Sequence, residues 1–246
     1  MPFDLGLGAS LWMAVAIFGA SWVRGYAGFG FAALVVSSAG LVTSPLYFVP
    51  VVVLADMILT AQQARGIWAD IAWRRVMTLF GGALIGVPIG VVALSSLGID
   101  TTRAIISVFV LLMCGLLWAG WSFRQSKGDV AHLGVGVISG LANGAAVGGL
   151  PVAVFFSAQP IAARTFRATV IAYFTLLDIW TIPNFWRAGL ITQDTLVATA
   201  ISLPLMSLGV WLGTRRFVAT GPSNFRRFAI LLLATLATFG LLKSVL

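Results

Sequence analysis

Long stretches without a charged residue dominate this chain. Each of them reaches or exceeds the roughly 17–25 residues that an α-helix needs to cross a bilayer. Of the 246 residues 60% are hydrophobic and only 9% are charged, whereas about a quarter are charged in an ordinary soluble domain. The stretches are Leu5–Val23, Gly25–Ala55, Val76–Ile99, Ala104–Phe123, Leu133–Ala163 and Thr195–Thr214. The sequence therefore predicts an all-α polytopic membrane protein with no room for a soluble domain.

The few charged residues are strongly biased toward cations. Lys and Arg number 15 against seven acidic residues, all of them Asp, which gives a net charge of +8. Such a charge can indicate a nucleic-acid binder. Here the basic residues stand at the ends of the apolar stretches, and no basic run with interleaved aromatic residues is left for a nucleic acid. We expect membrane lipid as the partner of this charge, and no nucleic acid.

Groups that carry enzyme chemistry are scarce. Cys114 is the single cysteine, His132 is the single histidine, and Glu is absent. This set supplies neither a zinc site nor a Ser-His-Asp arrangement. We therefore expect no metal, no cofactor and no enzymatic activity. Cys114 lies within an apolar stretch and is interpreted as part of the core, and His132 is expected at the membrane interface.

Several features recur at a nearly constant offset, which indicates an internal duplication. The predicted division is a first transmembrane repeat over residues 1–123, a cytoplasmic linker over 124–131 and a second repeat over 132–246. The matched features lie 120 to 123 residues apart: Gly28 and Gly148, Asp56 and Asp178, Arg65 and Arg187, Gly86-x-x-x-Gly90 and Gly209-x-x-x-Gly213, and Arg103 and Arg226.

The basic residues decide between two topologies, because Lys and Arg in short loops favour the cytoplasm. Eight single spans would split them seven and seven and leave Arg24 in the membrane. If Leu5–Val42 and His132–Ser157 are instead hairpins that enter and leave on one side, only Arg103, Arg187 and Lys243 face away from the cytoplasm. The eleven others then share the cytoplasmic face: Arg65, Arg74, Arg75, Arg124, Lys127, Arg164, Arg167, Arg215, Arg216, Arg226 and Arg227.

This bias predicts two inverted-topology repeats, each made of a broken helical hairpin and about three spanning helices. Ten complete spans give the same charge distribution and remain an alternative. Phe29–Val42 is short for a complete span, which favours re-entrant half-helices in the hairpins.

Two glycine clusters interrupt the hydrophobic regions at matching places in the halves, at 24–30 and at 140–151. Unwound backbone at membrane depth occurs where it is buried in protein or lines a cavity. The half-helices that follow would point their positive N-terminal ends at the break and create an anion site. The predicted binding residues in the clusters are Gly25, Tyr26, Gly28, Gly30, Asn143, Gly144, Gly148 and Gly149. By contrast, the Gly86 and Gly209 motifs are interpreted as close helix packing.

Two arginines are candidates for contact with an anion. Arg24 lies deep in apolar sequence at the first break, and Arg167 lies near the start of the helix that follows the second. A guanidinium donates two parallel hydrogen bonds, which suits a sulfonate, a sulfite or a carboxylate. The alternatives are a structural ion pair between Arg24 and Asp56, and a contact of Arg167 with lipid headgroups.

Asp56 and Asp178 occupy equivalent positions within apolar helices, so each must be paired, hydrated or protonated. They are the candidates for proton coupling, because a buried carboxyl can bind and release a proton during transport. A permanent ion pair with an arginine is the alternative.

The glycine clusters resemble motifs of the sulfite exporter TauE/SafE family, also called the toluene-sulfonate uptake permease family. The segment Phe18–Phe31, FGASWVRGYAGFGF, resembles its opening motif, and Gly140–Pro151 is similar to its second glycine motif. Phe166–Phe174, FRATVIAYF, resembles a motif of one branch. The resemblance implies transport, more often export, of sulfite, sulfonates, sulfoacetate or other small organic acids. Ser44–Pro50 departs from the smaller residues expected there, which leaves the size of the substrate open.

These observations predict a multi-pass transporter of the bacterial inner membrane that carries a small sulfur-containing anion by alternating access. An anion channel and a carrier of small carboxylates are the alternatives within transport. A membrane assembly factor or a receptor subunit is the alternative that does not involve transport. The identity of the anion, the direction, the coupling ion and the choice between a monomer and a homodimer stay open.

Overall fold

The computed structural model describes residues 2–63, 68–120, 122–123, 125–219 and 223–245, apart from the side chains at 27, 61–63, 217–219, 223–229, 232 and 245. Arg65 and Arg124 and the side chains of Arg226 and Arg227 therefore lie outside the described residues. Throughout the described part the regular structure is helical. The elements are η1 (Pro2–Asp4), α1 (Leu7–Ala27), α2 (Phe31–Val42), α3 (Pro45–Gln63), η2 (Trp68–Asp70), α4 (Trp73–Ser95), α5 (Ile99–Ala119), α6 (Asp129–Asn143), α7 (Gly149–Ser157), α8 (Ala163–Arg187), α9 (Gln193–Ala219) and α10 (Ser223–Val245).

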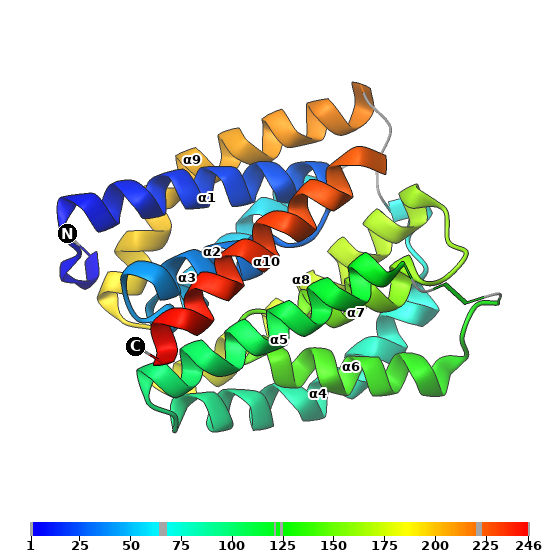
Figure 1. Ribbon diagram of the computed structural model, residues 1–246. Coiled ribbons are helices and arrows are strands. Elements are labelled where there is room, and N and C mark those ends of the chain that lie inside the picture. Colours follow the sequence, from blue (N-terminus) through cyan, green and yellow to red (C-terminus); the bar gives the residue numbers. More distant parts are fainter. Residues whose placement is uncertain (1, 64–67, 121, 124, 220–222, 246) are drawn as a thin grey trace.

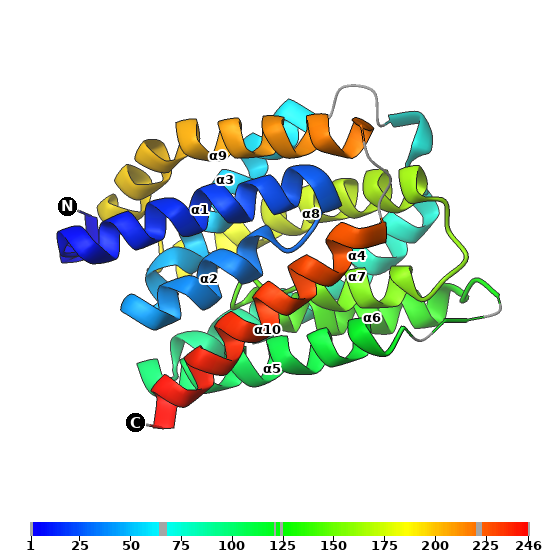
Figure 2. The same cartoon turned by 45° about the horizontal axis from the view of Figure 1, so that its top comes forward.

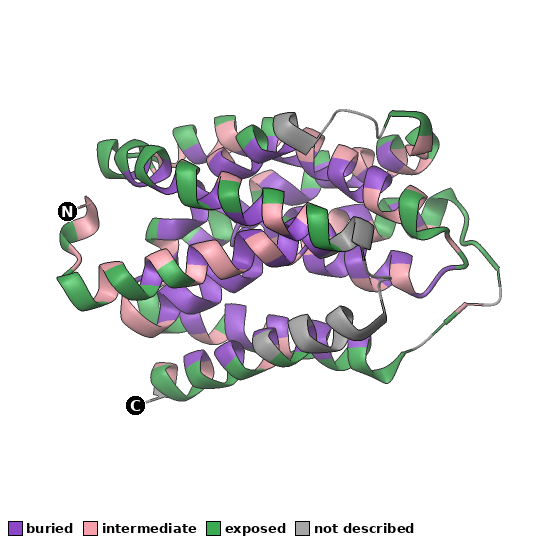
Figure 3. Ribbon diagram, turned by 90° about the horizontal axis from the view of Figure 1, so that it is seen from above, coloured by how far each residue is buried: buried purple, intermediate pink, exposed green. Residues whose placement is uncertain are grey.

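The outer surface of the bundle is apolar, as in a protein solvated by lipid. Among the described residues, five helices are long and apolar enough to cross a membrane: α1, α4, α5, α8 and α9. Large hydrophobic side chains on their outward faces are exposed, among them Val15 at 70% and Val92 at 68%. Buried residues face the interior between the helices, and exposed residues follow the outer faces (Figure 3). The prediction of an all-α polytopic membrane protein is confirmed.

Two helical hairpins interrupt the pattern of long helices. The first is α1 followed by α2, with the break at Gly28–Gly30, and the second is α6 followed by α7, with the break at 144–148. At about 1.5 Å per residue, α2, α6 and α7 reach only about 18, 22 and 14 Å, short of the roughly 30 Å hydrocarbon core. α1 has 21 residues and is long enough to cross, so the first hairpin has one full-length arm. The two hairpins open toward opposite ends of the bundle (Figures 1 and 2).

The helix ends divide the basic residues between the two ends of the molecule. Both chain termini lie at one end, together with the start of α5 and the ends of α8 and α10, which carry Arg103, Arg187 and Lys243 (Figure 1). The starts of α4, α6 and α8 and the end of α9 lie at the other end. These helix ends carry Arg74, Arg75, Lys127, Arg164, Arg167, Arg215 and Arg216. The positive-inside rule predicts that this second end faces the cytoplasm.

Glycines set the closest helix contacts. A Cβ at Gly86 or Gly90 of α4 would lie within 3 Å of the backbone of α6, and one at Gly213 of α9 would do so against α1. Helices approach this closely only where side chains are absent from the interface. The interpretation of these glycine motifs as packing contacts is therefore confirmed. α4 pairs with α6 in the same way that α9 pairs with α1.

Candidate functional site

A small cavity lies between the two helix breaks, inside the bundle. Its walls come from both halves of the chain and include six of the predicted site residues, three from each half. These are Arg24, Gly30 and Asp56, and Asn143, Gly149 and Asp178. About 40 Å³ is open to the centre of a water-sized sphere, which is room for a few water molecules. In this conformation an organic sulfonate would need the walls to move apart.

The starts of two short helices form part of the cavity wall. α2 begins at Phe31 and α7 begins at Gly149, and both residues line the cavity. Their N-cap residues, Gly30 and Gly148, provide no side-chain cap. The N-terminus of a helix carries about half a positive charge, because its first N–H groups have no partner within the helix. Two such ends on one cavity favour a negatively charged ligand.

Cations neutralise the opposite, negative end of α2. Arg103 of α5 donates a hydrogen bond to the Thr43 carbonyl, 3.4 Å away, and Lys243 of α10 donates one to the Leu41 carbonyl. These carbonyls belong to the last turn of α2 or to the residue that follows it. The negative C-terminal end of α2 is therefore compensated by these two cations, and it is not exposed to lipid. The positive N-terminal end remains at the cavity.

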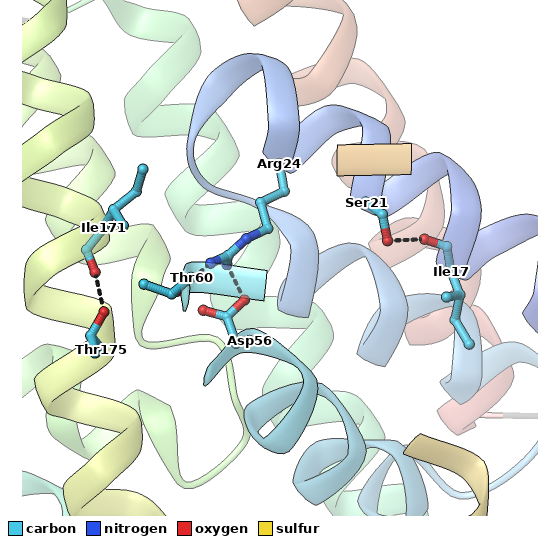
Figure 4. A network of polar contacts seen from close by, with 7 residues as sticks. All are labelled: Ile17, Ser21, Arg24, Asp56, Thr60, Ile171 and Thr175. Atoms are coloured by element: carbon cyan, nitrogen blue, oxygen red, sulfur yellow. Dashed lines mark hydrogen bonds and ion pairs between the residues drawn. The ribbon is translucent and has the colours of Figure 1, made fainter. Parts of the chain in front are cut away.

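Arg24 reaches from the last turn of α1 across to α3, where it forms an ion pair and hydrogen bond with Asp56 (Figure 4). Its second terminal nitrogen donates to Thr60 Oγ1 at 2.8 Å. Arg24 is 2% exposed and Asp56 is 6% exposed, so both charges are buried together. The Nε of Arg24 has no hydrogen-bond partner within the described part of the chain. One donor of this arginine is therefore free for a ligand.

The second half places an amide where the first half places a guanidinium. Asn143, in the last turn of α6, donates from Nδ2 to Thr181 Oγ1 of α8 at 2.8 Å. Asp178 lies one turn before Thr181, as Asp56 lies one turn before Thr60. Asp178 is 5% exposed, and its Oδ2 has no hydrogen-bond partner among the described residues.

The remaining predicted glycines lie beside the cavity. A Cβ at Gly25 would meet the backbone of Val210 on α9, and one at Gly144 would meet Gly90 on α4, so both glycines serve helix packing. Gly28 ends α1 with a left-handed φ of 81°, and Gly148 directly precedes α7. These four positions shape the breaks without being part of the cavity wall.

Arg167 and Tyr26 also lie outside the cavity wall. Arg167, in the first turns of α8, donates to the Gly25 carbonyl at 3.0 Å and to Thr214 Oγ1 of α9 at 3.2 Å. It thereby caps the C-terminal end of α1 and joins three helices. Tyr26 is buried, and its ring stacks on Trp22 with centroids 6.3 Å apart.

Thr60, Thr181 and Ala146 belong to the site, and sequence reasoning missed all three. The two threonines carried a usable signal, because each lies one helical turn after an aspartate that sequence reasoning had singled out. Ala146 lines the cavity with a left-handed φ of 55°. Alanine rarely adopts this conformation, so its residue type gives no warning of it.

Helices of membrane length around a small cavity that contains buried charged and amide side chains, with broken helices at its walls, have the build of a membrane transporter. The comparisons with known proteins agree. The family model of the sulfite exporter TauE/SafE family matches residues 13–239, so the chain belongs to this family. The probable sulfite/organosulfonate exporter TauE of Cupriavidus necator is 29% identical over 213 residues, 82% of each chain. No solved structure matches. The protein is a multi-pass membrane transporter of the bacterial inner membrane.

Proposed function

We propose that the protein exports small sulfur-containing anions, such as sulfite, sulfonates or sulfoacetate, across the inner membrane. The Cupriavidus necator relative, a probable sulfite/organosulfonate exporter, supports this class of substrate. The site supports a negatively charged substrate, because its hydrogen-bond donors and helix N-termini favour an anion. Membership of a transporter family supports transport rather than catalysis.

The observation that carries the proposal is the convergence of the α2 and α7 starts on one cavity with Arg24 and Asn143. An oxyanion there would accept hydrogen bonds from helix N–H groups, from the free Nε of Arg24 and from the Asn143 amide. Several acceptor oxygens around one centre, as in a sulfonate or a sulfite, match donors that come from several directions. Arg167 acts in this proposal by holding the end of α1 rather than by touching the anion.

We further propose that transport proceeds by alternating access between inverted repeats. In this proposal α1, α4 and α5 of the first repeat are equivalent to α6, α9 and α10 of the second. The packing of α1 on α9 then corresponds to that of α6 on α4, and α5 packs on its own equivalent, α10, as expected for two symmetry-related repeats. Since the cavity has room for only a few water molecules here, an organic sulfonate would require the halves to move relative to each other. Asp56 and Asp178 are the proposed proton-coupling residues.

Thermal unfolding of the purified protein tests the substrate class. The panel is sulfite, sulfoacetate, taurine, an aromatic sulfonate, sulfate and plain carboxylates. A ligand at about a hundred times its dissociation constant stabilises the protein by about 2.7 kcal/mol, which raises Tm by about 5–11 °C for a chain of this size. We expect this shift for sulfur oxyanions and its loss in Arg24→Ala. Arg187→Ala removes the same charge from an exposed position and should keep the shift.

Other outcomes point to the alternatives. Stabilisation by carboxylates alone would favour a carboxylate carrier. Flux in liposomes that persists unchanged when both aspartates are neutralised would favour an anion channel, because a channel needs no coupling carboxylate. Absence of flux from purified protein with any anion of the panel would favour an assembly or receptor subunit.

A further inference from the structure

The charges around the cavity are not shared equally between the two halves. In the first half Asp56 is paired with Arg24, whose second nitrogen bonds Thr60. In the second half the neutral Asn143 bonds Thr181, and Asp178 has no cation of its own. Asp178 is therefore the cavity carboxyl without an arginine partner, and its buried Oδ2 has no hydrogen-bond partner among the described residues.

We propose that Asp178 binds the transported proton, and that the site accepts a singly charged sulfur oxyanion only together with that proton. This inference rests on the proposed function and specifies its coupling. In it the two aspartates have different tasks. Asp56 holds Arg24 in place, and Asp178 gains and loses the proton in each cycle.

The charge balance of the cavity gives the reason. The Arg24 and Asp56 charges cancel, so the two helix starts, each worth about half a positive charge, are left to balance one negative charge. In the empty site the ionised Asp178 supplies that charge. When a monovalent anion enters, the same helix ends must balance the anion, and an ionised Asp178 would leave one buried negative charge in excess. A proton on Asp178 removes the excess.

Among the groups that face Asp178, Asp56 is the other carboxyl of the cavity, and it is already paired with Arg24. Asp56 and Arg24 are the charged groups that act on Asp178 from α3 and α1. On the same helix as Asp178, the buried Tyr173 donates a hydrogen bond from its hydroxyl to Ser139 Oγ at 2.8 Å, so this hydroxyl already has a partner. No histidine, cysteine or lysine lines the cavity as described. Since Asp56 is held by Arg24, Asp178 is the group free to change its protonation state.

Two properties of transport follow. One proton and one monovalent anion move together, with the proton taken from water on one side and released to water on the other, so no net charge crosses the membrane. The direction then follows the combined gradients of proton and anion, and export requires a cytoplasmic anion concentration high enough to exceed an opposing inward pH gradient. A divalent anion would exceed the charge of the helix ends by one, so the site should favour a hydrogensulfite or a monosulfonate over a dianion such as sulfate. This narrows the proposed substrates, because fully ionised sulfoacetate is also a dianion.

The experiment uses the full chain in liposomes with radiolabelled methanesulfonate, an anion that stays monovalent at all working pH values. Downhill uptake without any other gradient is measured first. An inside-alkaline gradient of one pH unit should then drive accumulation up to about tenfold, because one-to-one coupling equalises the two gradients. A potassium diffusion potential without a pH gradient should drive none. Sulfate should be carried at least tenfold more slowly.

Variants assign the proton to its residue. Asp178→Asn mimics the protonated state, so it should keep exchange of labelled for unlabelled methanesulfonate and lose accumulation by the pH gradient. Asp178→Glu should retain coupling. Asp194→Asn, the matched control, changes a carboxyl that accepts a hydrogen bond from the Phe3 amide outside the cavity, and it should behave as the unmodified protein.

The outcomes separate the two proposals. Gradient-driven accumulation that survives in Asp178→Asn would overturn the assignment of the proton. Uptake by the unmodified protein that follows membrane potential and ignores pH would overturn the coupling while leaving anion transport intact, and this measurement holds even if the variant does not fold. Absence of downhill uptake of every anion in the panel would instead refute the proposed function.

Discussion

Breaking the buried ion pair between Arg24 and Asp56 should destabilise the protein strongly. Both side chains are almost completely buried, and removal of one partner leaves the other charge without compensation. Losing one member of a buried pair typically costs about 3–5 kcal/mol. Arg24→Met keeps an unbranched apolar side chain in place of the arginine stem and also removes the hydrogen bond to Thr60. For a chain of this size, the expected fall in Tm is about 6–20 °C.

A double variant separates the pair from the general effect of changing the core. Replacing both partners, as Arg24→Met with Asp56→Asn, removes the uncompensated charge and should restore at least half of the lost stability. The assay is thermal unfolding of the purified protein in one detergent, at one protein concentration and without added anion. If the double variant unfolds at the same temperature as Arg24→Met, the cost does not come from an unpaired Asp56, and the argument from charge burial is refuted.

Three further substitutions test the breaks and the helix packing. Gly86→Leu should prevent α4 from packing on α6 and reduce the yield of folded protein on size-exclusion chromatography, whereas Gly8→Leu, with open space around it, should not. Gly28→Ala should lower stability by about 1–2 kcal/mol in thermal unfolding, because φ is 81° there, and an unchanged Tm would contradict that backbone conformation. Asn143→Ala should lower the free energy of unfolding by about 0.5–1.5 kcal/mol, because it removes the hydrogen bond to Thr181. It should also weaken the stabilisation by anions, and an unchanged stabilisation would place Asn143 outside the anion site.

Much of the fold could be predicted because membrane solvation leaves few options. Uncharged stretches of sufficient length become helices, since lipid offers no partner for unpaired backbone groups. The glycine clusters marked both hairpin breaks for the same reason. What the sequence could not supply was the length of each arm. α1 continues through Arg24 and Gly25 to Ala27, so the first break begins later than the first glycine of the cluster.

The types of the site residues could be predicted from the sequence. The partner that each side chain meets could be predicted less well. For Arg24 the sequence allows two interpretations, contact with the anion or an ion pair with Asp56. The structure has the ion pair, and the Nε of Arg24 has no hydrogen-bond partner among the described residues. Gly25 and Gly144 illustrate the difficulty, because glycine permits both unwound backbone and close packing. Which of the two applies depends on the helix that faces the glycine, here α9 or α4, and that helix lies far away in sequence.

Arg167 shows how such distant contacts change the role of a residue. Its place near the start of α8 fits either an anion ligand or a headgroup contact, yet its guanidinium bonds the Gly25 carbonyl, 142 residues away in sequence. That carbonyl lies in the last turn of α1, one residue after Arg24, and it also accepts a hydrogen bond from Thr214 Oγ1 at 3.2 Å. By fixing the end of α1, Arg167 also fixes the position from which Arg24 reaches Asp56. The proposed anion site would therefore depend on an arginine outside its wall.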